Sequence, residues 1–127
     1  MTARPPGETT ILVVDDDAMM RTLVGRTLRS EGFQVWTASG ALEARQVLTR
    51  IPDQLDLILT DVAMPGGMGP QLVAEVRQAY PRVRLLYMSS YSRKDLLGHG
   101  IDLETEDLLA KPFMPAELIA RVQVILG

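Results

Sequence analysis

The stretch Ile11-Leu12-Val13-Val14-Asp15-Asp16-Asp17 decides the fold class, because four consecutive apolar residues run directly into three aspartates. A short apolar run without alternation is typical of a strand buried on both faces, as the strands of parallel sheets are. The segment therefore predicts a central strand of a parallel sheet with carboxylates at its carboxyl end.

Strand and helix patterns alternate along the rest of the chain. Met20, Leu23, Val24, Thr27 and Leu28 share one helix face. Further strands are predicted at 33–38, 55–60, 83–88 and 108–110, and further helices at 39–50, 72–80, 92–98 and 115–126. Five strand–helix units with short connections predict a doubly wound α/β fold, a five-stranded parallel sheet with helices on both faces.

Several local signals mark where these elements begin. Ser39 is expected to cap the second helix, and Ser92 with Asp95 resembles a capping box. The Pro- and Gly-rich residues 1–9 are interpreted as a disordered arm or linker. Residues 10–127 are expected to form one domain.

The composition excludes several classes of protein. The chain of 127 residues has no cysteine, which rules out a disulfide framework, a thiolate nucleophile and a Cys-type zinc site. A net charge of −3 without a Lys/Arg cluster argues against direct nucleic-acid binding. Neither a membrane-spanning run nor a secretory signal is recognised, so no membrane insertion and a cytoplasmic location are expected.

Polar side chains follow four of the predicted strands. Asp15 and Asp16 follow the first, Asp61 the third, Ser89 the fourth and Lys111 the fifth. In open α/β sheets ligands bind beyond the carboxyl ends of the strands, so these side chains are expected to meet. Clustered carboxylates need a compensating cation, and hard oxygen ligands suit Mg²⁺.

The ordinary alternative is that aspartates after strands only cap helices or form turns. We favour that interpretation for Asp17. For the set of Asp15, Asp16, Asp61 and Lys111, a functional site is the better explanation, since turn residues need not gather as an acid cluster beside a lysine.

The order of these motifs resembles the signature of response-regulator receiver domains of two-component signalling. The resemblance covers residues 10–126 and rests on Val13–Asp16, Asp61–Pro65, Ser89 and Lys111–Phe113. The segments 88–91 and 108–113 are further similar to receivers of hybrid sensor histidine kinases. The resemblance implies a flavodoxin-like sheet order, 2-1-3-4-5.

By this resemblance Asp61 is the phosphoacceptor, which takes a phosphoryl group from a histidine kinase or a histidine phosphotransfer protein. Asp16, Asp61 and the backbone carbonyl of Ala63 would hold Mg²⁺, with Asp15 acting through water. Lys111 would pair with a phosphoryl oxygen. The activity implied is self-phosphorylation and slow self-dephosphorylation, not conventional enzyme turnover.

The resemblance also assigns supporting roles. The Ser89 hydroxyl and the Ser90 backbone amide would bind phosphoryl oxygens, and Pro112 would follow a cis peptide bond. Ala63 and Tyr91 would flank the route of the attacking water. Leu108 stands where receivers that drive output domains often carry an aromatic residue, so this switch aromatic is absent.

Other functions stay open to different degrees. A receiver-like interaction module that is never phosphorylated is the main alternative, and a weak homodimer is compatible with either function. A Mg²⁺-dependent aspartyl phosphatase would need a second acid two residues beyond the nucleophile, where Ala63 stands. No phosphate-binding glycine motif supports a nucleotide site.

Overall fold

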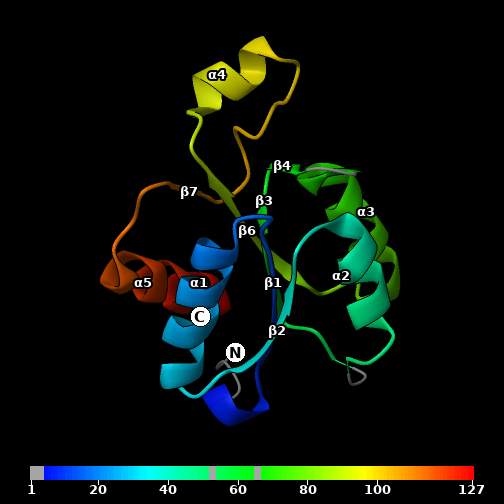
Figure 1. Ribbon diagram of the computed structural model, residues 1–127, viewed down its shortest axis with the longest axis vertical. Coiled ribbons are helices and arrows are strands. Elements are labelled where there is room, and N and C mark those ends of the chain that lie inside the picture. Colours follow the sequence, from blue (N-terminus) through cyan, green and yellow to red (C-terminus); the bar gives the residue numbers. More distant parts are fainter. Residues whose placement is uncertain (1–4, 52–53, 65–66) are drawn as a thin grey trace.

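The computed structural model describes residues 5–51, 54–64 and 67–127, and its centre is a five-stranded parallel sheet (Figure 1). The strands of this sheet are β1 (Thr10–Val14), β2 (Gln34–Ala38), β3 (Leu57–Asp61), β6 (Arg84–Ser89) and β7 (Leu108–Ala110). Their order is β2-β1-β3-β6-β7, which confirms the predicted doubly wound topology and the order 2-1-3-4-5.

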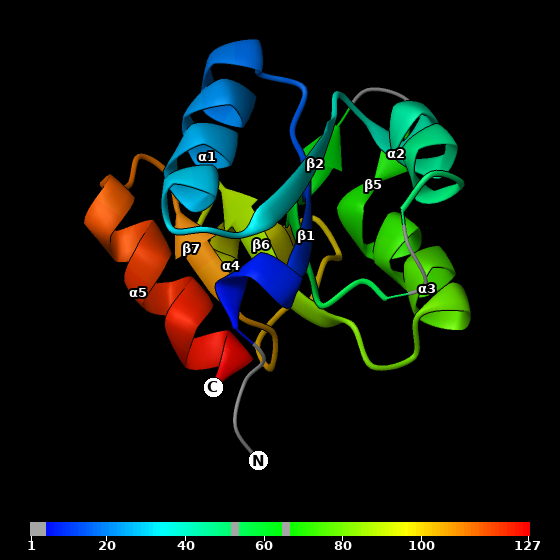
Figure 2. The same ribbon diagram turned by 90° about the horizontal axis from the view of Figure 1, so that it is seen from below.

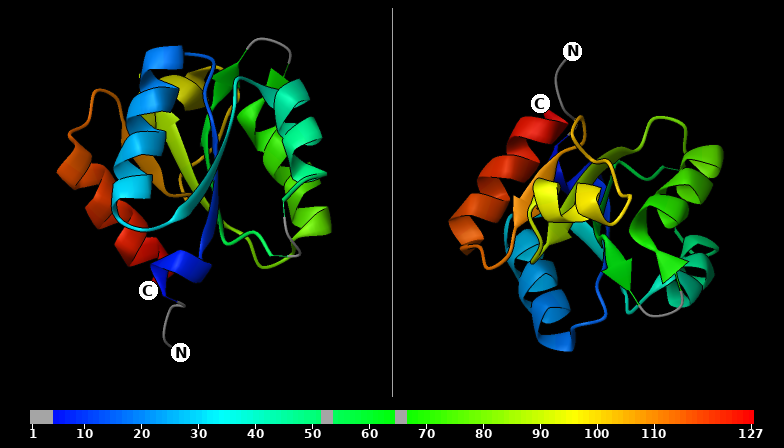
Figure 3. Two further views of the ribbon diagram at one scale, coloured as in Figure 1. Left: turned by 60° about the horizontal axis from the view of Figure 1, so that its bottom comes forward. Right: turned by 90° about the horizontal axis from the view of Figure 1, so that it is seen from above.

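Helices cover both faces of the sheet. They are α1 (Ala18–Ser30), α2 (Ala41–Leu48), α3 (Gly69–Ala79), α4 (Arg93–Gly98) and α5 (Pro115–Leu126). Figure 2 shows α1 and α5 on one face and α2 and α3 on the other. In Figures 1 and 3, α4 lies beyond the carboxyl ends of the strands, and its Leu96 belongs to the core beneath α2 and α3.

The apolar run that begins the domain is the most buried part of the sheet. Ile11 and Val13 belong to the core beneath α1 and α5, whereas Leu12 and Val14 belong to the core beneath α2 and α3. All four side chains are fully buried. The run is continuous because alternate residues serve two separate cores.

Several helix signals behave as the sequence predicts. Asp17 caps α1, since its carboxylate accepts from the N–H groups of Met19 and Met20 at 2.9 and 3.3 Å. The Ser92–Asp95 capping box is present, with hydrogen bonds of 3.1 and 3.4 Å. These findings confirm the capping role that the sequence favours for Asp17 and the predicted start of α4.

The predicted cap of the second helix is wrong by one residue. Gly40 is the N-cap of α2. The N–H and hydroxyl of Ser39 instead donate to the Glu43 carboxylate at 3.1 and 3.3 Å. Ser39 therefore pairs with the Glu43 side chain and does not act as the N-cap of α2.

Two segments carry local structure outside the predicted strands and helices. Pro6–Glu8 forms a short 3-10 helix, and the Gly7 carbonyl accepts a hydrogen bond from the Gln34 amide at 2.7 Å. Of the arm expected over residues 1–9, residues 1–4 lie outside the described part. After Asp61, β4 (Ala63–Met64) and β5 (Gly67–Met68) form a small antiparallel ribbon that no sequence pattern indicates.

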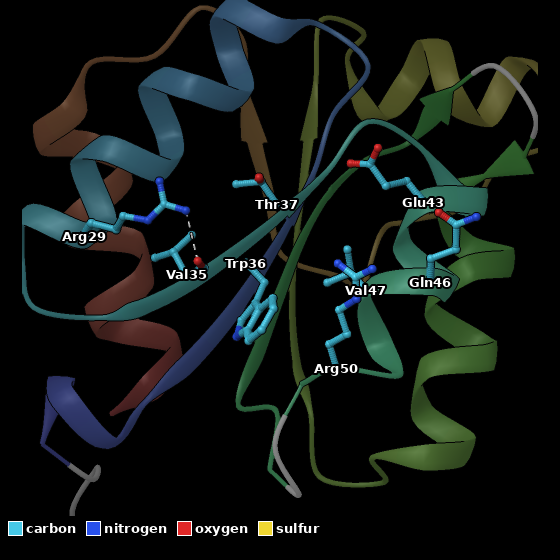
Figure 4. A pocket seen from close by; sticks show the side chains of 8 residues that line it. All are labelled: Arg29, Val35, Trp36, Thr37, Glu43, Gln46, Val47 and Arg50. Carbon is cyan, nitrogen blue, oxygen red and sulfur yellow. Dashed lines mark hydrogen bonds between the residues drawn. The ribbon is translucent and has the colours of Figure 1, made fainter.

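Arginines approach the outermost strands of the sheet. Arg29 of α1 donates to the Val35 carbonyl of β2 at 3.1 Å, and Arg121 of α5 donates to the Leu108 carbonyl of β7 at 3.2 Å. Arg29 also lines a pocket of about 410 Å³ beside β2, with Trp36 and Arg50 among the other lining residues (Figure 4).

Within the described ranges, no helix combines the length and apolar character needed to cross a membrane.

Candidate functional site

Three carboxylates meet at the carboxyl end of the sheet. Asp15 and Asp16 follow β1, and Asp61 ends β3, which lies next to β1 in the sheet. Each offers a carboxylate oxygen, and these oxygens lie within 4.8 Å of one another. The predicted clustering of these side chains at one edge therefore matches the structure.

Lys111 is the cation inside this cluster. Its ammonium donates to Asp15 Oδ2 at 2.7 Å and to Asp61 Oδ2 at 3.0 Å. Its backbone N–H donates to the Ser89 carbonyl at 2.8 Å, which extends the pairing of β7 with β6. The following peptide bond, Lys111–Pro112, is cis, the geometry that the resemblance implies.

The surroundings raise the pKa values of both Asp61 and Lys111. Burial raises the pKa of Asp61, and the negative charge of Asp15 adds to this, while the hydrogen bond from Lys111 and the Ala63 backbone amide oppose it. Burial alone would lower the pKa of Lys111, but the hydrogen bonds to Asp15 and Asp61 outweigh it and raise that pKa. The surroundings therefore favour the charged form of Lys111 and disfavour the charged form of Asp61.

The donor set fits a hard divalent cation. Three carboxylates face one ammonium group, so negative charge exceeds positive charge in the cluster. Carboxylate oxygens are the ligands that Mg²⁺ prefers. Asp15 and Asp61 give one oxygen each to Lys111, which leaves Asp16 and the second oxygen of Asp61 for a metal.

Asp15 and Asp16 differ in their surroundings although they are neighbours. Asp15 is fully buried, and its Oδ1 accepts from the Asp17 N–H at 2.9 Å. Asp16 is exposed. Of the two neighbouring acids, only Asp16 is therefore open to solvent.

Ser89 lies buried at the end of β6, one strand away from Asp61. Its Oγ accepts a hydrogen bond from the Tyr91 N–H at 2.9 Å, and within residues 5–51, 54–64 and 67–127 no group accepts its hydroxyl proton. Ser90 is exposed. Tyr91 is 60% exposed, and within the described residues its hydroxyl makes no hydrogen bond to the acid cluster.

The remaining predicted positions lie around this rim. Ala63 is exposed and pairs with Met68 in the β4–β5 ribbon. Leu108 is half-buried and packs against the core beneath α2 and α3. Pro65, which completes the motif that begins at Asp61, lies outside the described residues.

Two further residues touch the site and are not indicated by any sequence pattern. Arg21 of α1 donates to the Asp15 carbonyl at 2.7 Å. Gly69, at the start of α3, lies so close that an added Cβ would be 2.3 Å from the Asp61 carbonyl oxygen. A glycine at a helix start and an arginine in a first turn are common, so neither carries a signal in the sequence alone.

Comparison with known proteins places this geometry in a family context. The family described as "Response regulator receiver domain" matches residues 11–123. The sensor kinase CckA of Brucella abortus is 29% identical over 121 residues, which cover 94% of this chain and 13% of that protein. The transcriptional regulatory protein CpxR of Klebsiella pneumoniae is 36% identical over 116 residues, which cover 91% of this chain and 48% of that protein. The chain thus spans about half or less of these relatives' length.

Solved structures agree with the sequence comparison. The receiver domain of the hybrid histidine kinase CckA has a TM-score of 0.77 at 28% identity, with 93% of this chain and 99% of that chain covered. The response regulator protein TrrA of Thermotoga maritima, solved in complex with Mg²⁺-BeF, has a TM-score of 0.73 at 29% identity, with 92% of this chain and 98% of that chain covered.

Proposed function

Because this chain belongs to the response regulator receiver domain family, we propose that it takes up a phosphoryl group on Asp61 with the help of Mg²⁺. The observation that carries the proposal is the position of the Asp61 carboxylate. It lies 3.0 Å from the Lys111 ammonium and within 4.8 Å of the nearest carboxylate oxygens of Asp15 and Asp16. A nucleophile, a fixed cation and a set of metal ligands are therefore together in one place.

In this proposal a carboxylate oxygen of Asp61 attacks phosphorus. A new O–P bond forms, the P–N bond of a phosphohistidine breaks, and the donor imidazole leaves. The product is an acyl phosphate on Asp61. A histidine kinase or a histidine phosphotransfer protein is the proposed donor, and the cytoplasm is the proposed compartment.

Each neighbouring group has a defined task in the transfer. Mg²⁺ held by Asp16, Asp61 and the Ala63 carbonyl would neutralise charge on the phosphoryl oxygens. The Lys111 ammonium is already within hydrogen-bonding distance of Asp61, so a small shift brings it to a phosphoryl oxygen.

The Ser89 hydroxyl supplies a second contact, with the Ser90 backbone amide beside it. It accepts from the Tyr91 N–H and keeps its own proton for a phosphoryl oxygen. Donation to the phosphoryl group would draw the segment after β6 toward Asp61. That segment leads directly into α4, so the transfer can alter the position of this helix.

The test is incubation with Mg²⁺ and acetyl phosphate, followed by intact mass measurement and mapping of the adduct. We expect a single added phosphoryl group in the parent chain and none in Asp61→Asn, which keeps the shape of the side chain but removes the nucleophile. Equal labelling of both chains would move the site elsewhere. No adduct with acetyl phosphate or with a competent kinase would favour an interaction module that is never phosphorylated.

A further inference from the structure

Hydrogen bonds to its own carboxylate hold the Asp15 side chain in place, whereas the Asp16 side chain has no such bonds within the described residues. The Asp15 carboxylate accepts from the Asp17 N–H and from the Lys111 ammonium, and the Asp15 N–H donates to the Ala38 carbonyl at 3.1 Å. The exposed Asp16 carboxylate accepts no hydrogen bond from any residue in the described ranges. The direction in which Asp16 points is therefore set by its backbone.

Arg21, in the first turn of α1, makes a side-chain hydrogen bond to that backbone. Its guanidinium donates to the Asp15 carbonyl at 2.7 Å, a short, charge-assisted hydrogen bond. Side chains on a helix tilt toward its N-terminus, which explains why a residue of the first turn reaches back to the end of β1. The Arg21 N–H also donates to the Asp17 carbonyl at 2.9 Å, so both flanks of Asp16 are tied to one residue.

We propose that Arg21 is a positioning residue of the metal site, which holds the Asp15–Asp16 peptide plane and thereby keeps the Asp16 carboxylate facing Asp61. The peptide unit is rigid and planar, so fixing the Asp15 carbonyl also fixes the N–H and Cα of Asp16. The inference rests on the proposed Mg²⁺ site and adds to it a residue that touches neither the metal nor the phosphoryl group.

The sign of the effect separates positioning from simple electrostatics. Arg21 places a positive charge on the backbone carbonyl of Asp15, one residue of the acid cluster, and a positive charge there repels a divalent cation. If charge alone mattered, Arg21→Met would strengthen Mg²⁺ binding. If Arg21 positions Asp16, the same change weakens Mg²⁺ binding although it removes a repelling charge.

Arg29 provides a matched control on the same helix. It also donates to a backbone carbonyl, that of Val35, at 3.1 Å (Figure 4). Val35 lies in β2 and not among the residues of the acid cluster. Arg29→Met therefore removes the same kind of bond from α1 without touching the proposed metal site.

The experiment is a calorimetric Mg²⁺ titration of the parent, Arg21→Met, Arg21→Lys and Arg29→Met, with a thermal melt of each chain. We expect Arg21→Met to bind Mg²⁺ about tenfold more weakly, which corresponds to about 1.4 kcal/mol. Arg21→Lys, which keeps the charge and one donor, should recover most of the affinity. Arg29→Met should bind as the parent does.

A kinetic measurement adds a second criterion. At saturating Mg²⁺, Arg21→Met should take up phosphate from acetyl phosphate as fast as the parent, because only the metal affinity has changed. Unchanged or stronger Mg²⁺ binding in Arg21→Met, or an equal loss in Arg29→Met, would overturn the positioning role. Absence of Mg²⁺ binding in the parent would remove the proposed metal site itself, and this inference with it.

Discussion

Replacement of Gly69 by alanine tests how closely the start of α3 packs against the phosphoacceptor strand. Gly69 is buried, and its N–H donates to the Val62 carbonyl at 2.7 Å. A Cβ at this position would lie 2.3 Å from the Asp61 carbonyl oxygen and 3.2 Å from Val62 Cα. The backbone angle of Gly69 suits any residue, so the cost of alanine is purely steric.

The loss of stability in Gly69→Ala depends on which atoms must move to make room for the added Cβ. Both contacts are with backbone atoms, so rotation of a side chain cannot relieve them. Overpacking in a well-packed interior typically costs about 1–3 kcal/mol, and we expect about 2–3 kcal/mol here. For a chain of 127 residues this loss lowers the melting temperature by roughly 7–11 °C.

The assay combines urea unfolding with labelling by acetyl phosphate, and Gly98→Ala is the control. Gly98 ends α4, and no atom lies within 4 Å of an added Cβ there. We expect Gly98→Ala to change stability by less than about 1 kcal/mol, and Gly69→Ala to lose stability and label more slowly. If Gly69→Ala is as stable as Gly98→Ala and labels at the parental rate, the steric argument is refuted.

Three further predictions concern the metal, alkaline pH and the lifetime of the phosphoryl group. Asp16→Asn should weaken Mg²⁺ binding in a metal titration more than Asp17→Asn does, because only Asp16 is proposed as a direct ligand and Asn at position 17 still caps the helix; equal losses would contradict the ligand assignment. Burial, helped by a nearby glutamate, raises the pKa of Tyr87 to about 12. Since the folded-state pKa lies above the unfolded value, the associated stability is present below about pH 10 and is lost as the pH rises towards about 12. Phenolate absorbance should show one late ionisation that Tyr87→Phe removes, and its persistence in that variant would refute the assignment. Ala63→Asn and Tyr91→Ala should both lose phosphate faster than the parent in Mg²⁺, by orienting water and by admitting it respectively; a phosphoryl lifetime in Tyr91→Ala as long as in the parent would end the shielding hypothesis.

The sheet and the acid cluster were predictable because each depends on a strong, regular pattern. The run Ile11–Val14 is apolar at every position since its two faces serve different cores, and this is visible in sequence. Once the strands are recognised as parallel, their carboxyl ends must lie at one edge. That rule alone brings Asp15, Asp61 and Lys111 together.

The missed features depend on single contacts between particular side chains. The strand expected from Leu55 begins at Leu57, and just before it the Asp56 carboxylate accepts a hydrogen bond from the Thr10 N–H at 2.8 Å. Ser39 pairs with the Glu43 carboxylate and does not cap its helix. The β4–β5 ribbon consists of two-residue strands, which are too short for any periodicity.

The contacts of Arg29 and Arg121 have a consequence for the behaviour of the protein at high concentration. β2 and β7 are the outer strands, and an outer strand offers free carbonyl and N–H groups to any other chain in extended form. Each of these strands has one outward carbonyl occupied by a guanidinium from the adjoining helix. An incoming strand must displace a charged side chain before it can pair, at either border. Growth of the sheet at either border would therefore cost the molecule one of these hydrogen bonds.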